Sequence, residues 1–599
     1  MSLVKFSDII TAIKLEKIGF FGRIIAYLVF KLLQLDKINT IYDRSLETSS
    51  IPTRFLEALL YNFRVRYYIN PKDLKRIPTK GPVVVVANHP LGGIDGIILL
   101  HFLRQIRPDT KLMANFLLDR IAPLKDAFIS VNPFDAKQST KSSVRGFREA
   151  IRHLNKNGLF VVFPAGEVAG KLKGNIPIDP DWNLATMRLI KAAKAPVVPV
   201  YFHARNTHLF YRLAALHGLL RTARLPAEML HQKYRTIKLR IGKPISVKDQ
   251  EAHASLSDYA AFLRKKVFVL ANTYDRKNIM KRMSSPLRRR NSKIQPIDPS
   301  LPVSALKAEI AFLQTHKKSL LKSKDYELFL SDSSAIPNMV HEIGRQRELA
   351  FRAVGEGTNK AVDLDHYDTA YLHLFLWDHK EEKLVGAYRL GLGKELMEKH
   401  GLAGFYLAEL FNFDPETHAM LGKTIELGRA FVAQQYQQRP MPLFLLWKGI
   451  IHATLRYPDY AYLMGSVSIS NQFSKFTKSL MIEFMRSHYY DPYLAQLITP
   501  KKEFKVKLKE KDKEFVFDET SADLNKFDKL IDELEPGDFR LPVLIKKYIK
   551  QNARVVSFNV DPLFNNAIDG LMYIKIKDIP SATVQPVLEE FQASFASDA

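Results

Sequence analysis

The chain has 599 residues and a mass of 68.6 kDa, which is too long for a single hydrophobic core, so we expect at least two domains. Its 46% hydrophobic and 25% charged residues exclude a disordered or fully membrane-embedded protein. The sequence contains no cysteine, which excludes disulfides, thiolate metal sites and a cysteine nucleophile.

The net charge of +27 is concentrated in one half of the chain. Residues 1–300 contain 51 Lys and Arg against 22 Asp and Glu, whereas residues 301–599 contain 38 against 40. We therefore expect the first half to face an anionic partner, which would be a membrane surface, an acidic protein or nucleic acid.

The N-terminus shows no cleavage pattern of a secretory signal. The most apolar early segment, Ile18 to Leu35, is interrupted by Arg23 and Lys31. A spanning helix needs about 20 apolar residues, so we predict an amphipathic helix at the membrane surface. A spanning helix and a helix buried against the domain are the alternatives. Residues 1–75 are predicted as membrane-associating helices.

Short apolar runs alternate with a helical pattern in residues 76–280. The predicted strands are Val83–Val86, Lys111–Leu118, Leu159–Phe163 and Pro196–Phe202. A helix capped by Ser139 or Thr140 and stopped by Gly158 is predicted between two of them. Its apolar positions at helical spacing are Val144, Phe147, Ile151 and Leu154. This alternation predicts an α/β domain with a mixed, partly parallel sheet.

Residues 281–305 are predicted as a basic linker, because Lys281 to Pro299 is rich in Pro, Ser and Arg. Its triplet Arg288–Arg290 is interpreted as solvated, with contact to lipid phosphates as the alternative. A second α/β domain is predicted over residues 306–599. Its strands are predicted at Tyr371–Asp378, Leu384–Leu392, Thr424–Val432 and Tyr462–Ile469, with an amphipathic helix carrying Leu443, Leu446, Trp447, Ile450, Ile451 and Leu455 between the last two. The sequence shows no internal repeat and no metal-ligand spacing.

The first candidate site follows the Val83–Val86 strand. His89 is followed by Asp95, which is the pairing that activates a hydroxyl group: the imidazole takes the proton and the carboxylate orients the imidazole. Gly92 and Gly93 would let backbone N–H groups approach a developing oxyanion, and Asn88 adjoins the histidine. A histidine that only satisfies a loop carbonyl is the alternative.

Three later segments extend this pattern: Phe128–Pro133, Phe163–Glu167 and Val197–Val200. With Asn88–Asp95 they resemble, in order, the NH-x-x-x-x-D, FI-x-R, FPEGTR and VPV motifs of the glycerolipid acyltransferase family, the lysophosphatidate acyltransferase type. The resemblance implies that His89 and Asp95 are catalytic, that Gly166 and Glu167 contact substrate, and that an acyl group passes directly from a thioester to a lipid hydroxyl.

The sequence departs from this family at three places. Five residues separate His89 from Asp95 where the family has four, so we expect a loop bulge that restores the pairing. Val131 and Val168 stand where the family keeps arginines that hold the acceptor's phosphate. We therefore expect an acceptor without glycerol phosphate, unless Arg145 or Arg148 compensates.

The second candidate site consists of charged residues at strand ends or inside apolar runs, where an unpaired charge would be costly. These residues are Arg347, Asp365, Asp368, Arg389, Glu426 and Arg429. One interpretation is a structural ion-pair network. The other is a site that binds the carboxylate of an amino acid and positions its amine.

The same residues resemble the acyl-homoserine-lactone synthase branch of the GNAT-like N-acyltransferases, and more closely the ornithine-lipid synthases. Their R-x-x-x-F, D-x-Y-D and E-x-x-R patterns occur here in order, and the segments Arg540–Val543, Phe558–Pro562 and Phe564–Asn565 resemble the family's tail. The resemblance implies that Glu426 assists amine deprotonation and that Asp365 and Asp368 bind the amine or shape its pocket. Arg389 and Arg429 would hold a carboxylate or the acyl carbonyl.

The segment Gln437–Pro442 lacks the glycines of a pyrophosphate-binding loop and contains two prolines, which cannot donate a backbone hydrogen bond. We therefore predict acyl carrier protein rather than coenzyme A as donor, with no bound cofactor and no metal.

Together the two resemblances predict a bifunctional aminolipid synthase. Its C-terminal domain would N-acylate an amino acid of the ornithine or glycine type with a 3-hydroxyacyl chain, and its N-terminal domain would O-acylate the resulting lyso-aminolipid. We expect it on the cytoplasmic face of the inner membrane, peripheral or monotopic, with its basic half toward anionic lipid and the acidic carrier. The alternative is a single-activity lysophospholipid acyltransferase with a non-catalytic second domain. A nucleic-acid partner is disfavoured because no binding motif is present.

Overall fold

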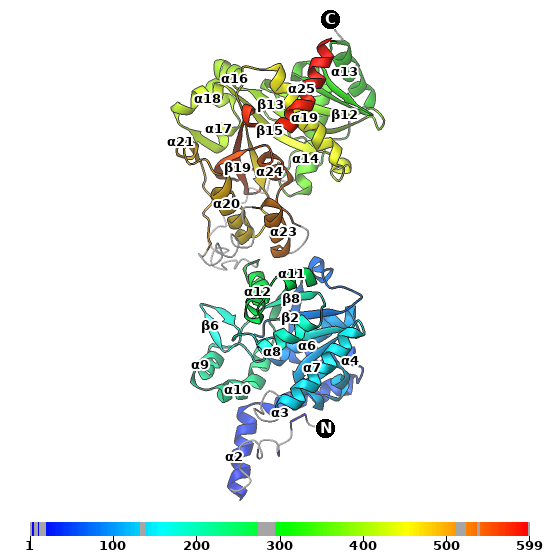
Figure 1. Cartoon of the computed structure of the whole chain (residues 1–599), viewed down its shortest axis with the longest axis vertical. Coiled ribbons are helices and arrows are strands. Elements are labelled where there is room, and N and C mark those ends of the chain that lie inside the picture. Colours follow the sequence, from blue (N-terminus) through cyan, green and yellow to red (C-terminus); the bar gives the residue numbers. More distant parts are fainter. Residues whose placement is uncertain are drawn as a thin grey trace. The chain divides into compact units, whose positions relative to one another are not determined.

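The computed structural model describes residues 19–131, 139–273, 294–508, 523–535 and 539–596, with a few isolated positions before residue 19. The chain forms two compact units (Figure 1): Met1–Tyr274 with Asp532–Asp538, and Asp275–Ile531 with Phe539–Ala599. The predicted arginine triplet 288–290 and most of the predicted linker lie outside the described residues. The helix α13 (Val303–Thr315) begins just before residue 305, the predicted end of the linker.

The first unit is built on a seven-stranded mixed sheet. In spatial order its strands are β1 (Arg66–Ile69), β9 (Thr236–Ile241), β8 (Val197–His203), β2 (Val83–Ala87), β5 (Leu159–Val162), β3 (Lys111–Asn115) and β4 (Phe128–Val131). Neighbouring strands are parallel except β8 and β9, which confirms the predicted partly parallel sheet. The central strands β2, β5 and β8 are apolar on both faces, as expected of strands covered by helices on both sides.

Helices cover both faces of this sheet. Val83 and Val85 pack with α3 (Leu35–Thr48), α4 (Pro52–Phe63) and α6 (Gly93–Ile106), whereas Val84 and Val86 face α7 (Ser139–Asn155), α8 (Leu184–Ala192) and α12 (Leu256–Phe268). The remaining elements of the unit are α2 (Gly19–Leu32), α5 (Pro71–Leu74), α9 (His208–Leu216), α10 (Gly218–His231), α11 (Val247–Glu251) and the hairpin β6 (Lys171–Lys173) and β7 (Ile176–Ile178).

Two sequence predictions need correction here. The strand expected over Lys111–Leu118 stops at Asn115, and residues Phe116–Arg120 form a 3₁₀ turn, because an apolar run alone does not distinguish the two. The helix expected to stop at Gly158 ends at Asn155, and Asn157 takes the left-handed conformation with φ 62°. A Cβ at position 158 would lie 2.3 Å from the ring of His153, so a larger residue there would displace that ring.

The second unit is built on an eight-stranded sheet. Its spatial order is β10 (Ser319–Ser323), β11 (Tyr326–Ser331), β12 (Leu372–Asp378), β13 (Lys383–Leu392), β15 (Thr424–Val432), β16 (Tyr462–Ile469), β19 (Ala567–Lys575) and β18 (Arg554–Asp561). Only β15 and β16 pair in parallel, and they do so between Thr424 and Leu427 on one strand and Tyr462 and Gly465 on the other. Beyond that point each strand continues with its other neighbour, so the sheet opens between them.

The helices of the second unit pack around this sheet. They are α13 (Val303–Thr315), α14 (Pro337–Ala353), α15 (Tyr367–Ala370), α16 (Gly393–His400), α17 (Leu407–Leu410), α18 (His418–Gly422), α19 (Pro440–Arg456), α20 (Lys475–Tyr489), α21 (Leu494–Leu497), α24 (Val543–Ile549) and α25 (Ser581–Ala596), with a small sheet of β14 (Phe411–Phe413) and β17 (Ile498–Pro500). The helix α23 (Leu524–Leu534) begins in the second unit, and its residues from Asp532 onward belong to the first. All four predicted strands and the predicted helix α19 are present within a few residues of their expected bounds.

Candidate active sites

The first site lies where β2 ends and α6 begins. His89 follows the strand, Gly92 precedes the helix with φ 89°, and Asp95 stands in the first helical turn. The Nδ1 atom of His89 lies 3.0 Å from Oδ2 of Asp95. The extra residue between them is therefore accommodated in the turn, and the positive φ explains why glycine stands at position 92.

Asp95 is fully buried and holds several groups at once. Its Oδ2 accepts hydrogen bonds from the backbone N–H groups of Leu91 (2.8 Å) and Gly92 (3.1 Å), while Oδ1 has no hydrogen-bond partner among the described residues. Burial raises the pKa of Asp95, and the contacts with His89 and the two amides oppose that shift. The carboxylate thus fixes both the imidazole and the turn that carries it.

The imidazole of His89 is held on further sides. Its ring stacks on Phe163 with centroids 4.0 Å apart, and its backbone N–H donates to Asp179 while its carbonyl accepts from Ala169 N–H at 2.9 Å. The neighbouring Asn88 is buried, and its amide group makes two hydrogen bonds with the backbone of Phe202 on β8. The structure therefore gives Asn88 a positioning contact between two strands.

The segment after β5 contains Gly166, Glu167 and Val168, and the sequence of this segment departs from the family motif. Gly166 has φ 72°, and the half-exposed Glu167 pairs with Arg221 of α10, a partner that the sequence did not indicate. Val168 is buried in an apolar cluster that also contains Phe210, Tyr211, Leu172 and Leu225. A Cβ on Gly92 would contact Val168 and Leu225, so this apolar cluster adjoins the His89 loop. Gly93 begins α6 against Met229.

Arg145 and Arg148, the two residues that could compensate for the missing phosphate-binding arginines, are exposed on α7. Asn132 and Pro133, the end of the predicted Phe128–Pro133 segment, lie outside the described residues.

The charged residues of the second unit form a closed ring of three arginines and three aspartates. In ring order they are Arg347, Asp363, Arg429, Asp365, Arg389 and Asp368. The six contacts between successive members measure 2.5–4.0 Å. Each aspartate bridges two arginines, so the charges within the ring balance. Asp363 is the member that sequence reasoning missed, because it lies in a loop outside the motifs.

The pKa values of the aspartates Asp365 and Asp368 reflect this balance of charge. Burial alone would raise the pKa of Asp368, but Arg347 and Arg389 hold it well below its usual range. Arg389 and Arg429 likewise lower the pKa of Asp365 against the effect of its burial. Arg389 also lies 5.1–5.7 Å from the centroids of three tyrosine rings, namely Tyr367, Tyr371 and Tyr406.

Arg347 is fully buried and holds Asp363 and Asp368. We expect Arg347→Ala to destabilise the second unit by about 3–5 kcal/mol, because it leaves buried carboxylates without their counter-charge. Thermal and urea unfolding of the full chain measure this effect. Lys307→Ala, which breaks the exposed pair of Lys307 with Glu382, is the control and should cost about 0–1 kcal/mol. Equal effects of the two substitutions would contradict a structural role for the ring.

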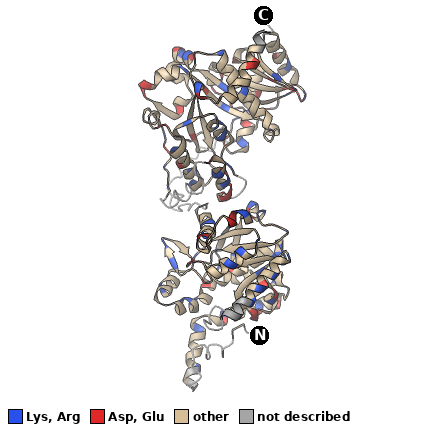
Figure 2. Ribbon diagram, in the orientation of Figure 1, with Lys and Arg blue, Asp and Glu red and all other residues tan. Residues whose placement is uncertain are grey.

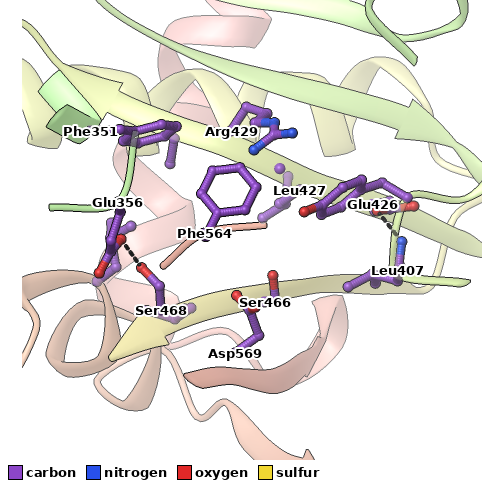
Figure 3. Close-up of a pocket in the computed structure, with 15 residues that line it drawn as sticks. Phe351, Glu356, Leu407, Glu426, Leu427, Arg429, Ser466, Ser468, Phe564 and Asp569 are labelled. Carbon is purple, nitrogen blue, oxygen red and sulfur yellow. Dashed lines mark hydrogen bonds between the residues drawn. The ribbon is translucent and has the colours of Figure 1, made fainter. Parts of the chain in front are cut away.

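Next to the ring lies a small cavity of about 90 Å³ at the opening between β15 and β16 (Figure 3). Glu426 and Arg429 of β15 line it with Tyr406 and Phe564. The ring members Arg347, Asp365, Asp368 and Arg389 are not among its lining residues, so in this structure they support the cavity wall. Arg429 has φ 51° and sits at an irregularity in the pairing of β13 with β15, which turns it toward the cavity.

Glu426 is fully buried, and its carboxylate accepts hydrogen bonds from the hydroxyl of Tyr371 at 2.7 Å and the N–H of Leu407 at 3.1 Å. Burial raises the pKa of Glu426 to about 7, and the hydrogen bonds and Arg389 oppose the shift. A carboxylate poised near neutrality beside a cavity is suited to accept a proton. Tyr371 was expected as a strand residue, and its partnership with Glu426 could not be foreseen.

After β15 the chain enters α19 at Pro440, with Pro442 two residues further. Neither residue has a backbone N–H, so the first turn of α19 offers fewer donors to a pyrophosphate than an ordinary helix start. Among the described residues, no group of three or more His, Asp or Glu is arranged to hold a metal ion.

The family models match both units. An acyltransferase model matches residues 19–277, and a model of an acetyltransferase (GNAT) domain matches residues 346–447. The fold and the two sites thus define a two-domain acyltransferase, an enzyme that uses acyl donors as co-substrates.

The comparisons with individual proteins agree with this class. A glycine N(alpha)-acyltransferase of Phocaeicola vulgatus is 31% identical over 258 residues, covering 41% of this chain and 77% of the relative. The chain belongs to the family of this N-acyltransferase. A lyso-glycine lipid O-acyltransferase of the same organism is 26% identical over 263 residues, covering 43% of this chain and 90% of the relative. The bifunctional N- and O-acylating organisation predicted from the sequence is thereby confirmed.

Among solved structures, the 1-acyl-sn-glycerophosphate acyltransferase of Thermotoga maritima has 17% identity and a TM-score of 0.24, covering 44% of this chain and 90% of that chain.

Proposed function

We propose that the chain makes a diacylated aminolipid in two steps. The second unit joins a 3-hydroxyacyl chain to the amine of an amino acid of the glycine or ornithine type. The first unit then joins a second acyl chain to the 3-hydroxyl group. The observation that carries the proposal is the presence, in one chain, of a His–Asp pair for a hydroxyl acceptor and a buried carboxylate at a cavity for an amine acceptor.

The apolar cluster around Val168 supports a phosphate-free acceptor in the O-acyl step. Where the glycerolipid acyltransferases keep an arginine, Val168 packs with Phe210 and Tyr211 close to the His89 loop. An apolar wall would not compensate a phosphate dianion but would accept an acyl chain. The acceptor that fits is a lyso-aminolipid, whose reacting hydroxyl lies on an acyl chain.

In the O-acyl step the hydroxyl proton passes to Nε2 of His89 as the oxygen attacks the thioester carbonyl. Asp95 holds Nδ1 and stabilises the imidazolium that forms. Collapse of the tetrahedral intermediate breaks the carbon–sulfur bond, and the proton leaves with the thiol. The backbone N–H of Gly93 would stabilise the oxyanion, because the N–H of Gly92 is engaged by Asp95.

In the N-acyl step Glu426 assists removal of a proton from the amine. The amine attacks the thioester of the 3-hydroxyacyl donor, which forms an amide and releases a thiol. Arg429 lines the same cavity and would bind the carboxylate of the amino acid or the acyl carbonyl. The prolines at the start of α19 favour acyl carrier protein over coenzyme A as donor, because few N–H groups remain for a pyrophosphate.

We propose that the enzyme works on the cytoplasmic face of the inner membrane. None of the helices in the described part of the chain combines the length and hydropathy needed to cross a bilayer. Phe21, Leu28 and Leu32 of α2 are 61–74% exposed, which argues against the alternative of a helix buried against the domain. Lys and Arg residues are spread over the first unit (Figure 2), in keeping with attraction to anionic lipid.

Replacing Phe21, Leu28 and Leu32 together with serine should weaken binding to anionic vesicles at least tenfold, because each apolar side chain contributes up to about 1.5–3 kcal/mol when buried. Co-sedimentation with phosphatidylglycerol vesicles measures the change. Tyr493→Ser, which removes an exposed aromatic ring of the second unit, is the control. Undiminished binding of the triple variant would show that α2 is not the contact.

Expression in a bacterium that lacks aminolipids tests the proposed function. Lipid mass spectrometry should detect a new phosphate-free diacyl aminolipid and its monoacyl precursor. The lipid stains with ninhydrin only if the amino acid carries a second amine, because the first amine becomes the amide. Acylation of lysophosphatidate without such lipids would instead support a single-activity enzyme.

A further inference from the structure

Two buried carboxylates, those of Glu356 and Asp569, line the side of the cavity opposite β15, and a third, that of Asp561, lies close enough to Asp569 to affect its pKa. Asp569 lies on β19, Asp561 ends β18, and Glu356 follows α14; each is at most 8% exposed. Glu356 accepts a hydrogen bond from Ser468 at 2.7 Å, and Ser468 faces Asp569 across the β16–β19 pairing. Glu356 and Asp569 line the cavity, on the side away from Arg429 in Figure 3.

The charge of this cluster is not balanced as the charge of the ring is. Burial, followed by the charges of Asp561 and Glu356, raises the pKa of Asp569 to about 8, against the opposing effects of Arg429 and Ser466. Burial also raises the pKa values of Glu356 and Asp561. Arg429 is already paired with Asp365, so its charge is shared with the ring. The cluster would therefore be stabilised by a further cation.

Arg429 offers the complementary half of the same cavity. Its Nε is buried, has no hydrogen-bond partner among the described residues, and lies 4.0 Å from Oδ2 of Asp363. One side of the cavity thus has an unused donor on a guanidinium, and the other has uncompensated carboxylates. This is the complement of a zwitterion.

The walls and the size of the cavity fit a small organic cation. Phe564 packs against Arg429 at 4.6 Å, and Phe351 and Tyr406 complete an aromatic lining. Aromatic faces and carboxylates together favour ammonium groups. A volume of about 90 Å³ accommodates a ligand of few heavy atoms.

We propose that Glu356 and Asp569 form a subsite that binds an ammonium group of the acceptor amino acid, with the carboxylate of that amino acid on Arg429 and with Asp561 adding negative charge next to Asp569. The proposal rests on the proposed N-acyltransferase function of this cavity and identifies how the acceptor is recognised. The ammonium group is either the α-ammonium, which glycine carries, or the side-chain ammonium of a diamino acid.

Amino-acid binding to the full-length protein tests the subsite with four probes. Glycine and norvaline carry only an α-ammonium, 5-aminopentanoate carries only the distal one, and ornithine carries both. Calorimetry with Asp569→Asn and Glu356→Gln should show at least tenfold weaker binding of the probes that carry the recognised group. Loss confined to glycine, norvaline and ornithine assigns the α-ammonium, and loss confined to ornithine and 5-aminopentanoate assigns the distal one.

Glu327→Gln is the matched control, because Glu327 is a buried carboxylate of β11 bonded to Gln314 and His379 and does not line the cavity. It should bind all probes as the wild type does. Asp569→Asn should melt at or above the wild-type temperature at pH 8, because it removes a charge that burial disfavours. If Asp569→Asn melts at a lower temperature than the wild type, the affinities of Glu356→Gln and Ser468→Ala for the same probes test the subsite in its place.

Unchanged affinities for every probe in both Asp569→Asn and Glu356→Gln would overturn the subsite. The N-acyl product separates this outcome from failure of the proposed function. A wild type that forms the amide while the variants keep their amino-acid KM refutes the subsite alone. A wild type that binds amino acids but forms no amide refutes the proposed function and leaves the subsite standing.

Discussion

His89→Asn should abolish the O-acyl step and cause the monoacylated aminolipid to accumulate. His89 is the only group of its turn that can take a hydroxyl proton at neutral pH, since Asp95 is buried behind it and engaged by two backbone amides. Loss of a general base lowers the rate by about 10²–10⁴-fold. Mass spectrometry of the host lipids, and a direct assay with a synthetic lyso-aminolipid, measure the effect.

A second histidine in the same unit provides a matched control. His253 stacks on Phe262 with centroids 4.0 Å apart, as His89 stacks on Phe163, but it has no carboxylate partner of the Asp95 kind in the contacts described. His253→Asn should therefore alter packing by a similar amount and leave the O-acyl rate within a few-fold of wild type. A normal diacyl product in the His89 variant would contradict the assignment of the base.

Much of the fold could be predicted because the central strands are apolar on both faces. Val83–Ala87 and Leu159–Val162 differ from their predicted bounds by one residue, since four consecutive buried apolar residues leave few alternatives. The strands β18 and β19 were not predicted. The place of β19 beside β16 depends on pairing between residues about a hundred positions apart, which local patterns do not report, and β18 joins the sheet only through β19.

The same limit applies to the sites. The pairing of His89 with Asp95 could be predicted because both residues lie in one turn. The separate roles of the charged residues in the second unit could not be predicted from the sequence. Asp363 joins the ring, and Asp569 lines the cavity, only because separate elements of the fold come together. In the structure Asp365 and Asp368 form ion pairs with arginines of the ring. This is the arrangement that the alternative interpretation, a structural ion-pair network, describes. The uncompensated charge lies instead on β18, β19 and the end of α14.

Glu426→Gln should abolish amide formation and with it both lipids, because the O-acyl step depends on the product of the N-acyl step. Glutamine keeps the shape of the side chain and can still accept from Tyr371 or Leu407, but it cannot take a proton. We expect a loss of about 10²–10⁴-fold in the N-acyl rate. Supplying synthetic lyso-aminolipid should restore the diacyl lipid, because the first unit keeps its own base.

The pH dependence gives a second, independent measure of the same residue. A base must be deprotonated, so the wild-type N-acyl rate should rise through about pH 7, and this limb should be absent from the residual rate of Glu426→Gln. The folded-state pKa lies above the ordinary value of 4.5, so ionisation destabilises the wild type as pH rises between these values. Glu426→Gln should therefore gain stability relative to wild type from pH 4 to pH 8, by up to about 3 kcal/mol. A variant that loses activity and shows no such gain would be inactive for a reason other than the missing carboxylate.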